Sequence, residues 1–169
     1  MRPSPFASTL RIALVAALLV PAGLRAQDSG IPVGTRAPNA TAQTLDGQPA
    51  DLAAWLGKEP IFIEFWATWC PNCRQLEPQL LKLQEQYRGK VRFVGVSVSV
   101  NQSPELVKRY VAQHGLQGEQ LYDKKGNLTD AYEVPATSYV VVINAKGDVV
   151  YTGLGAKQDL GAAIAKALK

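Results

Sequence analysis

The only two cysteines of the chain are placed to do redox chemistry. Cys70 and Cys73 lie three positions apart, separated by Pro71 and Asn72. Two thiols at this spacing can close into a disulfide and open again through a mixed disulfide with another thiol. A crosslink across so short a loop removes little entropy from the unfolded chain, so a purely structural disulfide would add little stability here. The pair therefore indicates a redox-active dithiol.

The neighbouring residues predict different roles for the two thiols. Pro71 suits the first position of a helix because it has no N–H to leave unsatisfied, which makes Cys70 the N-cap. The Cys70 sulfur then accepts hydrogen bonds from the free N–H groups of Asn72 and Cys73, and the helix dipole favours its thiolate form. We expect Cys70 to be the attacking nucleophile and Cys73 the resolving thiol. Trp69, Pro71 and Asn72, which flank the sulfur atoms, are expected to bind substrate.

Glu64 is the only charged residue in the apolar run from Ile61 to Trp66. If it lies beneath Cys73 with no lysine nearby, desolvation raises the pKa of its carboxyl group. Such a group can take a proton from Cys73 as that thiol attacks the mixed disulfide. We therefore predict that Glu64 is a catalytic proton carrier. The alternative is structural, with the carboxylate reaching the end of the strand or pairing with a distant arginine.

Metal binding is the other use of a dithiol. Zinc needs about four ligands, and the chain offers two cysteines and one histidine, His114. We expect no metal and no other cofactor. A copper-handling or substrate-binding module that uses the dithiol as a ligand pair is the alternative from another class. Reduction of insulin disulfides would support the redox function, whereas metal retained after purification would support the binding module. His114, at an expected helix C-terminus, is predicted to have no chemical role.

Hydrophobic patterning predicts the elements that position these residues. Near-continuous apolar runs over 61–66 and 91–100 are typical of strands covered on both faces. Between them, apolar residues at helical spacing predict a helix over 71–88, bent at Pro78 and closed by Gly89. Strand, helix and strand form a parallel crossover unit. The cysteines therefore lie where a buried strand passes into a helix.

Further elements flank this crossover unit. A strand near 40–45 and a turn at Asp46-Gly47 predict an N-terminal β-hairpin, which a short helix over 51–56 follows. The remaining predictions are a helix from Ser103 to Gly115, a hairpin of strands 138–143 and 148–152, and a closing amphipathic helix over 160–168. This order predicts an α/β fold, a mixed central sheet flanked by helices with an N-terminal β-hairpin extension.

The first 26 residues are typical of a secretory signal peptide. A basic start precedes a nine-residue apolar core over 12–20, and helix-breaking residues follow it before Ala26. We predict cleavage after Ala26 and a periplasmic or other extracytoplasmic location, where disulfides persist. Leu24 is larger than the small residue preferred at its position. An uncleaved signal that anchors the protein to the membrane is therefore the alternative.

The rest of the chain is expected to form one domain. Residues 27–38, rich in glycine and proline, are predicted to be a lead-in, and 39–169 the domain. Of the 169 residues, 47% are apolar and 19% charged, which excludes a disordered chain. Three units of the net charge of +4 come from Arg2, Arg11 and Arg25, which leaves 15 basic against 14 acidic residues beyond residue 26. This near-neutral part gives no reason to expect a nucleic acid partner, and we expect a monomer.

The motifs together resemble one protein family. Residues 65–74, the strand 93–97 and the stretch 135–153 are similar to the TlpA-like, ResA-like branch of the thioredoxin superfamily, and the resemblance extends over 33–168. It implies a thioredoxin-like fold and an exported thiol-disulfide oxidoreductase. Such proteins are usually reductants that a membrane-bound thiol partner supplies with electrons, and they act on apocytochrome c or other extracytoplasmic protein disulfides.

The resemblance also implies roles for single residues. Cys70 matches the family nucleophile, Cys73 the resolving cysteine, and Pro135 a cis-proline that faces the disulfide. Val134 is then expected to offer its backbone as a short strand edge to an extended substrate peptide. Glu64, six residues before Cys70, matches the buried aspartate of cytoplasmic thioredoxins.

The chain departs from the family pattern at three places. Leu76 stands where many relatives have a glutamate, and Glu77 lies one position further on. The strand over 91–100 has no lysine in its interior, and the approach to Pro135 is shorter than usual.

The active-site layout of this family is common to reductants, oxidants and isomerases, so the direction of electron flow stays open. A peroxiredoxin-like thiol peroxidase is the other alternative, disfavoured because the residues before Thr68 lack the proline of its motif.

Overall fold

The computed structural model describes residues 30–169. Its centre is a seven-stranded sheet in the order β2-β1-β5-β4-β3-β6-β7. The strands are β1 (Thr41–Thr44), β2 (Pro49–Asp51), β3 (Ile61–Trp66), β4 (Arg92–Val98), β5 (Glu119–Asp123), β6 (Tyr139–Ile143) and β7 (Val149–Leu154). β4 pairs in parallel with β3 and β5, and the other neighbours are antiparallel. The predicted mixed sheet with a β3–helix–β4 crossover is confirmed.

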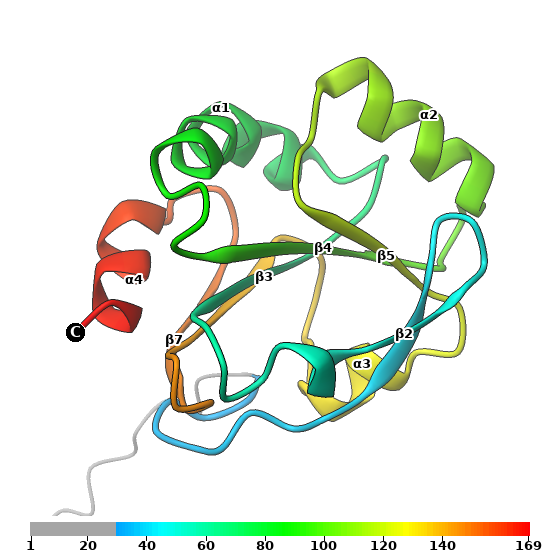
Figure 1. Ribbon diagram of the computed structural model, residues 1–169. Coiled ribbons are helices and arrows are strands. Elements are labelled where there is room, and N and C mark those ends of the chain that lie inside the picture. The colour runs from blue at the N-terminus through cyan, green and yellow to red at the C-terminus, as the bar shows by residue number, and fades with distance from the viewer. Residues whose placement is uncertain (1–29) are drawn as a thin grey trace, which may run out of the picture.

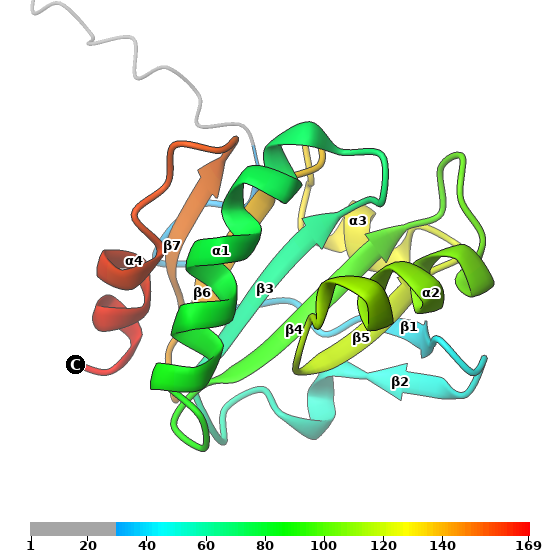
Figure 2. The same cartoon turned by 90° about the horizontal axis from the view of Figure 1, so that it is seen from above.

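Helices cover both faces of this sheet. The helices are α1 (Pro71–Gln86), α2 (Pro104–His114), α3 (Asn127–Ala131) and α4 (Leu160–Ala167), with a 3₁₀ helix, η1 (Leu52–Ala54). α1, α2 and α4 cover one face, and α3 and η1 lie on the other (Figures 1 and 2). Ser103 caps α2 as predicted, and α1 continues through Pro78 without a break.

Two elements, β5 and α3, are absent from the sequence prediction. β5 lies between β4 and β1, so it joins the N-terminal hairpin to the main sheet. Only its last three residues are buried, and the two apolar ones among them, Leu121 and Tyr122, are too few to indicate a strand. α3 has five residues and no side-chain cap, so it leaves no signal at its start. The hairpin predicted as an extension is therefore an integral part of the sheet.

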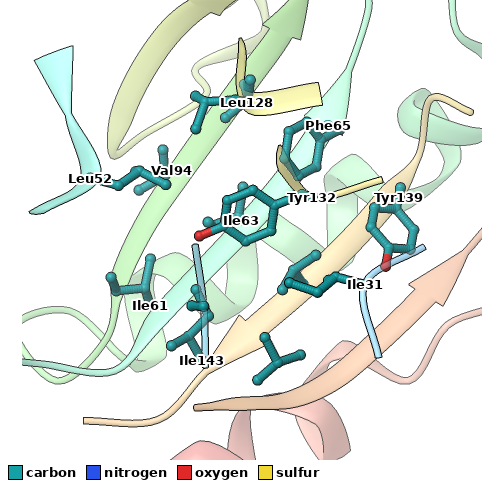
Figure 3. Packing of buried hydrophobic residues seen from close by; sticks show 14 of the residues in the cluster. Ile31, Leu52, Ile61, Ile63, Phe65, Val94, Leu128, Tyr132, Tyr139 and Ile143 are labelled. Atoms are coloured by element: carbon teal, nitrogen blue, oxygen red, sulfur yellow. The ribbon is translucent and has the colours of Figure 1, made fainter. Parts of the chain in front are cut away.

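Every residue of β3 is buried. Because successive residues of a strand point to opposite faces, Ile63 and Phe65 face the α3 side, whereas Glu64 lies on the α1 side. Figure 3 shows the first of these two layers, in which Ile63 and Phe65 pack with Leu128 and Tyr132. β3 is therefore buried on both faces and paired on both edges, with β4 and β6.

The expected lead-in packs against the domain. Ile31 and Ala37 are buried in the same apolar layer. The Gly34 N–H donates to the Val149 carbonyl at 2.8 Å, and the Ala37 N–H donates to the Gly147 carbonyl at 2.9 Å. The described part of the lead-in thus contributes to the core. The predicted signal peptide and residues 27–29 lie outside the described residues, and within 30–169 no helix is long and apolar enough to cross a membrane.

Candidate active site

Cys70 and Cys73 form a disulfide at the start of α1, with their Cα atoms 5.4 Å apart. Cys70 is the N-cap, and its sulfur accepts a hydrogen bond from the Cys73 N–H at 3.1 Å. The predicted cap is confirmed, although of the two expected donors only Cys73 donates among the hydrogen bonds of the described chain. The two residues are 1% and 3% exposed. The predicted pair is therefore a covered disulfide held at a helix N-terminus.

Hydrogen bonds from the loop after β4 hold the segment before Cys70. The N–H and the hydroxyl of Thr68 both donate to Gln102 Oε1 at 2.9 Å. The Tyr122 hydroxyl donates to the Gln102 carbonyl at 2.8 Å. Trp69 Nε1 donates to the Val100 carbonyl at 2.8 Å. Sequence reasoning missed Gln102, because its partner at position 68 is too far away along the chain to leave a local signal.

An apolar hollow of about 440 Å³ lies beside Trp69. It is lined by Trp69, Val98, Ser99, Val100, Asp123, Gly126, Thr129, Val134, Ala136 and Thr137. Trp69 and Val100 are 43% and 57% exposed, so apolar surface is open to solvent here. Two of the predicted substrate-binding residues, Trp69 and Val134, therefore share one surface. Pro71 and Asn72 are exposed at the start of α1, outside its lining.

The predicted cis bond before Pro135 is wrong, because no peptide bond within 30–169 is cis. The loop instead has one residue with positive φ before Pro135, Glu133 (φ 50°), and one after it, Ser138 (φ 66°). The trans form of an X–Pro bond is favoured by about 0.5–1 kcal/mol unless the surroundings impose the other isomer. The Val134 N–H is also engaged, donating to the Thr129 carbonyl at 3.0 Å, so it is not the free edge expected for a peptide.

Behind the disulfide, Glu64 lines a cavity of about 20 Å³, enough for one water molecule. Cys73 lines the same cavity, whereas Cys70 does not. Opposite Glu64 in β4 is Gly95, and a Cβ there would lie 2.4 Å from Gln120 Oε1. The missing side chain of Gly95 therefore leaves room for Gln120, which lines the same cavity. The structure thus places Glu64 and the expected resolving thiol around one small, partly open cavity.

The Glu64 carboxyl group is nearly removed from solvent. The residue is 6% exposed, and its Oε1 has no hydrogen-bond partner. Desolvation and then the negative charge of Glu77 raise the pKa of Glu64 from 4.5 to about 8. No arginine or lysine within residues 30–169 forms an ion pair with it. The alternative prediction of a distant arginine partner is therefore wrong, and Glu64 can exchange a proton near neutral pH.

Glu77 on α1 connects this cavity to α2. It lines the cavity, its Oε1 accepts from the Tyr110 hydroxyl at 2.5 Å, and its Oε2 lies 2.8 Å from His114 Nδ1. The Tyr110 and His114 rings stack with centroids 3.8 Å apart. Their spacing of four residues shows from sequence that they share a helix face. Their contact with Glu77 depends on how α1 and α2 pack. The sequence prediction treated His114 only as a residue at a helix C-terminus and therefore missed this contact.

Known proteins with similar sequences and structures define the class of this protein. Residues 32–168 match the family model Redoxin. The chain is 32% identical over 137 residues to the thioredoxin-like protein YneN of Bacillus subtilis, covering 79% of each. It is 30% identical over 122 residues to the thiol-disulfide oxidoreductase ResA of Halalkalibacterium halodurans, covering 72% of this chain and 68% of that one.

A solved structure extends this similarity to the fold. It is that of a secreted Mycobacterium tuberculosis disulfide oxidoreductase homologous to E. coli DsbE, with a TM-score of 0.65 and 29% identity over 74% of this chain and 93% of that one. The fold is therefore thioredoxin-like, and the protein is a thiol-disulfide oxidoreductase with a Cys-x-x-Cys pair. The chain belongs to the Redoxin family, in which it is ResA-like.

The raised pKa of Glu64 predicts how stability depends on pH. In the oxidised protein the folded state holds a proton on Glu64 that the unfolded state has released between pH 4.5 and about 8. The wild-type free energy of unfolding should therefore fall across this window, by about 1.4 kcal/mol for each unit of the shift at most. Glu64→Gln removes this dependence, so its stability relative to the wild type should increase from pH 4.5 to pH 8.

Urea unfolding at several pH values measures this difference. Glu85→Gln is the control, because it makes the same chemical change at a side chain that is 66% exposed. If the difference in free energy of unfolding between Glu64→Gln and the wild type stays constant from pH 4.5 to pH 9, folding does not raise the pKa of the Glu64 carboxyl group and the prediction is wrong.

Proposed function

We propose that this protein is an exported reductase of extracytoplasmic protein disulfides, with a place in cytochrome c maturation, and that it cycles between the Cys70–Cys73 dithiol and disulfide. The asymmetry of the two cysteines is the observation on which the proposal rests. Cys70 caps α1 with its sulfur, and Cys73 lines the cavity that contains Glu64. One thiol is thus suited to attack and the other to lose a proton to a buried base.

Each turnover has two exchange steps. The Cys70 thiolate attacks a substrate disulfide, which forms a mixed disulfide and releases the first substrate sulfur as a thiolate. Cys73 then attacks the Cys70 sulfur while its proton passes to Glu64, and the second substrate sulfur leaves. The enzyme dithiol has lost two electrons and the substrate disulfide has gained them. A membrane-bound thiol reductant restores the dithiol, and no cofactor takes part.

The hollow beside Trp69 is the proposed substrate surface. Trp69 and Val134 contribute to an apolar lining that suits the side chains around a substrate cysteine. Pro71 and Asn72, exposed at the first turn of α1, would meet the substrate backbone on the opposite side of the sulfur atoms. Pro135 is exposed between the two positive-φ residues, and its role is to limit the conformations of this loop.

Export rests on the first 26 residues and on the relatives. That segment has the basic start, apolar core and breaking residues of a signal peptide. The Mycobacterium tuberculosis relative is described as secreted. The protein then acts outside the cytoplasm, either free after cleavage or anchored through an uncleaved signal, and as a monomer.

The two thiols are expected to differ in trapping experiments. Cys73→Ser should accumulate a mixed disulfide with a protein or peptide substrate, because attack by Cys70 proceeds and resolution does not. Cys70→Ser should accumulate none. Non-reducing electrophoresis and intact mass measure the adducts, and the variant without either cysteine is the control. Equal trapping by the two single variants would contradict the assignment.

The reduction potential of the Cys70–Cys73 couple tests the direction of electron flow. A reductase should have a value near that of thioredoxin, about −270 mV, measured by equilibration with glutathione or dithiothreitol. A value near −120 mV would make the protein an oxidant and contradict the proposed direction while leaving the exchange chemistry intact.

Glu64→Gln should slow resolution and leave attack by Cys70 nearly unchanged. Rapid mixing of the reduced protein with a peptide disulfide separates the two steps, because each releases one half of the peptide. Loss of a positioned base typically costs about 10²- to 10⁴-fold, so we expect resolution to slow by at least roughly tenfold at pH 7. Glu85→Gln is the matched control. Resolution at the wild-type rate from pH 6 to pH 9 would show that Glu64 is not the proton carrier.

A further inference from the structure

Two buried oxygen atoms at the Glu64 cavity have no hydrogen-bond partner. They are Glu64 Oε1 from β3 and Gln120 Oε1 from β5, and neither is bonded to a group within residues 30–169. Both residues line the same cavity, which has room for about one water molecule. A buried acceptor without a donor is destabilising, because the group has given up its hydrogen bonds to water. Two such atoms at one small cavity indicate that a single donor serves both.

The register of the sheet brings the two side chains to one gap. Gly95 in β4 pairs with Glu64 in β3 and with Gln120 in β5, so the three residues form a row across neighbouring strands (Figure 2). A Cβ on Gly95 would lie 2.4 Å from Gln120 Oε1, so the Gln120 amide occupies the place of the missing side chain. Because adjacent strands are about 4.8 Å apart, this oxygen lies roughly one strand spacing from the base of the Glu64 side chain. The Glu64 carboxyl group can therefore reach it, directly or through one water molecule.

The orientation of the Gln120 amide is fixed on its other side. Its Nε2 donates to the Gln117 carbonyl at 3.0 Å. A flipped amide would place its oxygen against this carbonyl, and two acceptors would then face each other. The Trp66 indole N–H lies at the same gap, but it forms no hydrogen bond with Gln120 Oε1. The amide presents an acceptor to the cavity, so its partner there must supply the hydrogen.

We propose that Gln120 is a positioning residue that accepts a hydrogen bond from the protonated Glu64 carboxyl group, directly or through the one water molecule for which the cavity has room. The amide oxygen favours the neutral carboxyl group and repels the carboxylate. A hydrogen bond to the neutral form raises the pKa of a carboxyl group, in the same direction as burial and the charge of Glu77. Gln120 thus makes Glu64 a stronger base.

Glu77 is the one other charged group within residues 30–169 that lines this cavity. It lies on α1, and both of its carboxyl oxygens have partners on α2, Tyr110 and His114. The residues that face Glu64 from β4, β5 and β6 are uncharged. Cys73 on α1 does not titrate in the oxidised protein, because its sulfur is in the disulfide. The amide from β5 is therefore the free acceptor for the Glu64 proton.

The consequence for turnover rests on the proposed role of Glu64 as the base. During resolution Glu64 takes the Cys73 proton, and the new O–H group donates to Gln120 as it forms. When the dithiol is restored, the same proton returns to Cys73 and the carboxylate is left. Gln120 gains and loses no proton, so it acts only through Glu64.

Titration of Glu64 in Gln120→Leu tests the proposal. Leucine fills the site without an acceptor, and the Gln117 carbonyl keeps its hydrogen bond from Gln84 Nε2 at 2.9 Å. We expect the Glu64 pKa, about 8 in the wild type, to fall by roughly one pH unit, the effect of one neutral hydrogen bond. The carbon-13 resonance of the labelled carboxyl group in the oxidised protein measures it, and Glu64→Gln identifies the resonance. Gln113→Leu, at an exposed position of α2, is the matched control.

A purely structural role of Gln120 predicts the opposite result. If the side chain only fills space, leucine makes the cavity more apolar, and desolvation keeps the Glu64 pKa at its wild-type value or raises it. A pKa that stays or rises in Gln120→Leu overturns the proposal. Gly95→Ala is a second variant, because its methyl group takes the position of the amide oxygen and leaves the glutamine in the chain. It should also lower the Glu64 pKa, and a wild-type value there would count equally against the proposal.

The pH profile of resolution separates this inference from the proposed function. If Glu64 is the base, the rise of the resolution rate with pH should move to lower pH in Gln120→Leu, by the same amount as the pKa. A lowered pKa with an unchanged profile would confirm the hydrogen bond and contradict the role of Glu64 as the base. An unchanged pKa would contradict the role of Gln120 and leave the proposed base in place.

Discussion

Glu64 lies in the middle of a fully buried strand, and the free energy lost in desolvating its carboxyl group must be offset by the packing around it. β3 is paired on both edges, with β4 and β6, and buried on both faces. A strand in this position is held firmly enough to keep a carboxyl group out of water. The functional state of Glu64 therefore depends on the whole central sheet, including the apolar layer on the opposite face.

The same enclosure explains why the two cysteines differ. α1 begins after a short loop that follows β3, and Cys73 in its first turn lines the same cavity as Glu64. Cys70, at the cap, has its sulfur at the N-terminus of the helix, whereas Cys73, one turn later, faces inward to the cavity. The helical repeat thus converts a spacing of three residues into two chemical environments. This geometry supports the proposed division of nucleophilic attack and proton transfer between the two thiols.

Apart from Glu77, the residues that line the cavity with Glu64 are neutral, and none of them is a cation. The position opposite it in β4 is Gly95, and Gln120 from β5 fills part of the space. The second charge at the cavity is Glu77, of the same sign, which raises the pKa of Glu64 further. This arrangement makes the α1–α2 contact important, because Glu77 is oriented by Tyr110 and His114 from α2.

Local patterns in the sequence were sufficient for much of the fold and for the centre of the site. The cap at Cys70, the cap at Ser103 and the strand around Glu64 depend on residues within a few positions of one another, and the corresponding elements lie within two residues of their predicted bounds. Only the tertiary structure decided the place of β5 in the sheet, the trans bond at Pro135, and the contact between Glu77 and His114. Each of these depends on which surfaces meet when distant segments pack, and hydrophobic periodicity and capping contain no information about contacts across such separations.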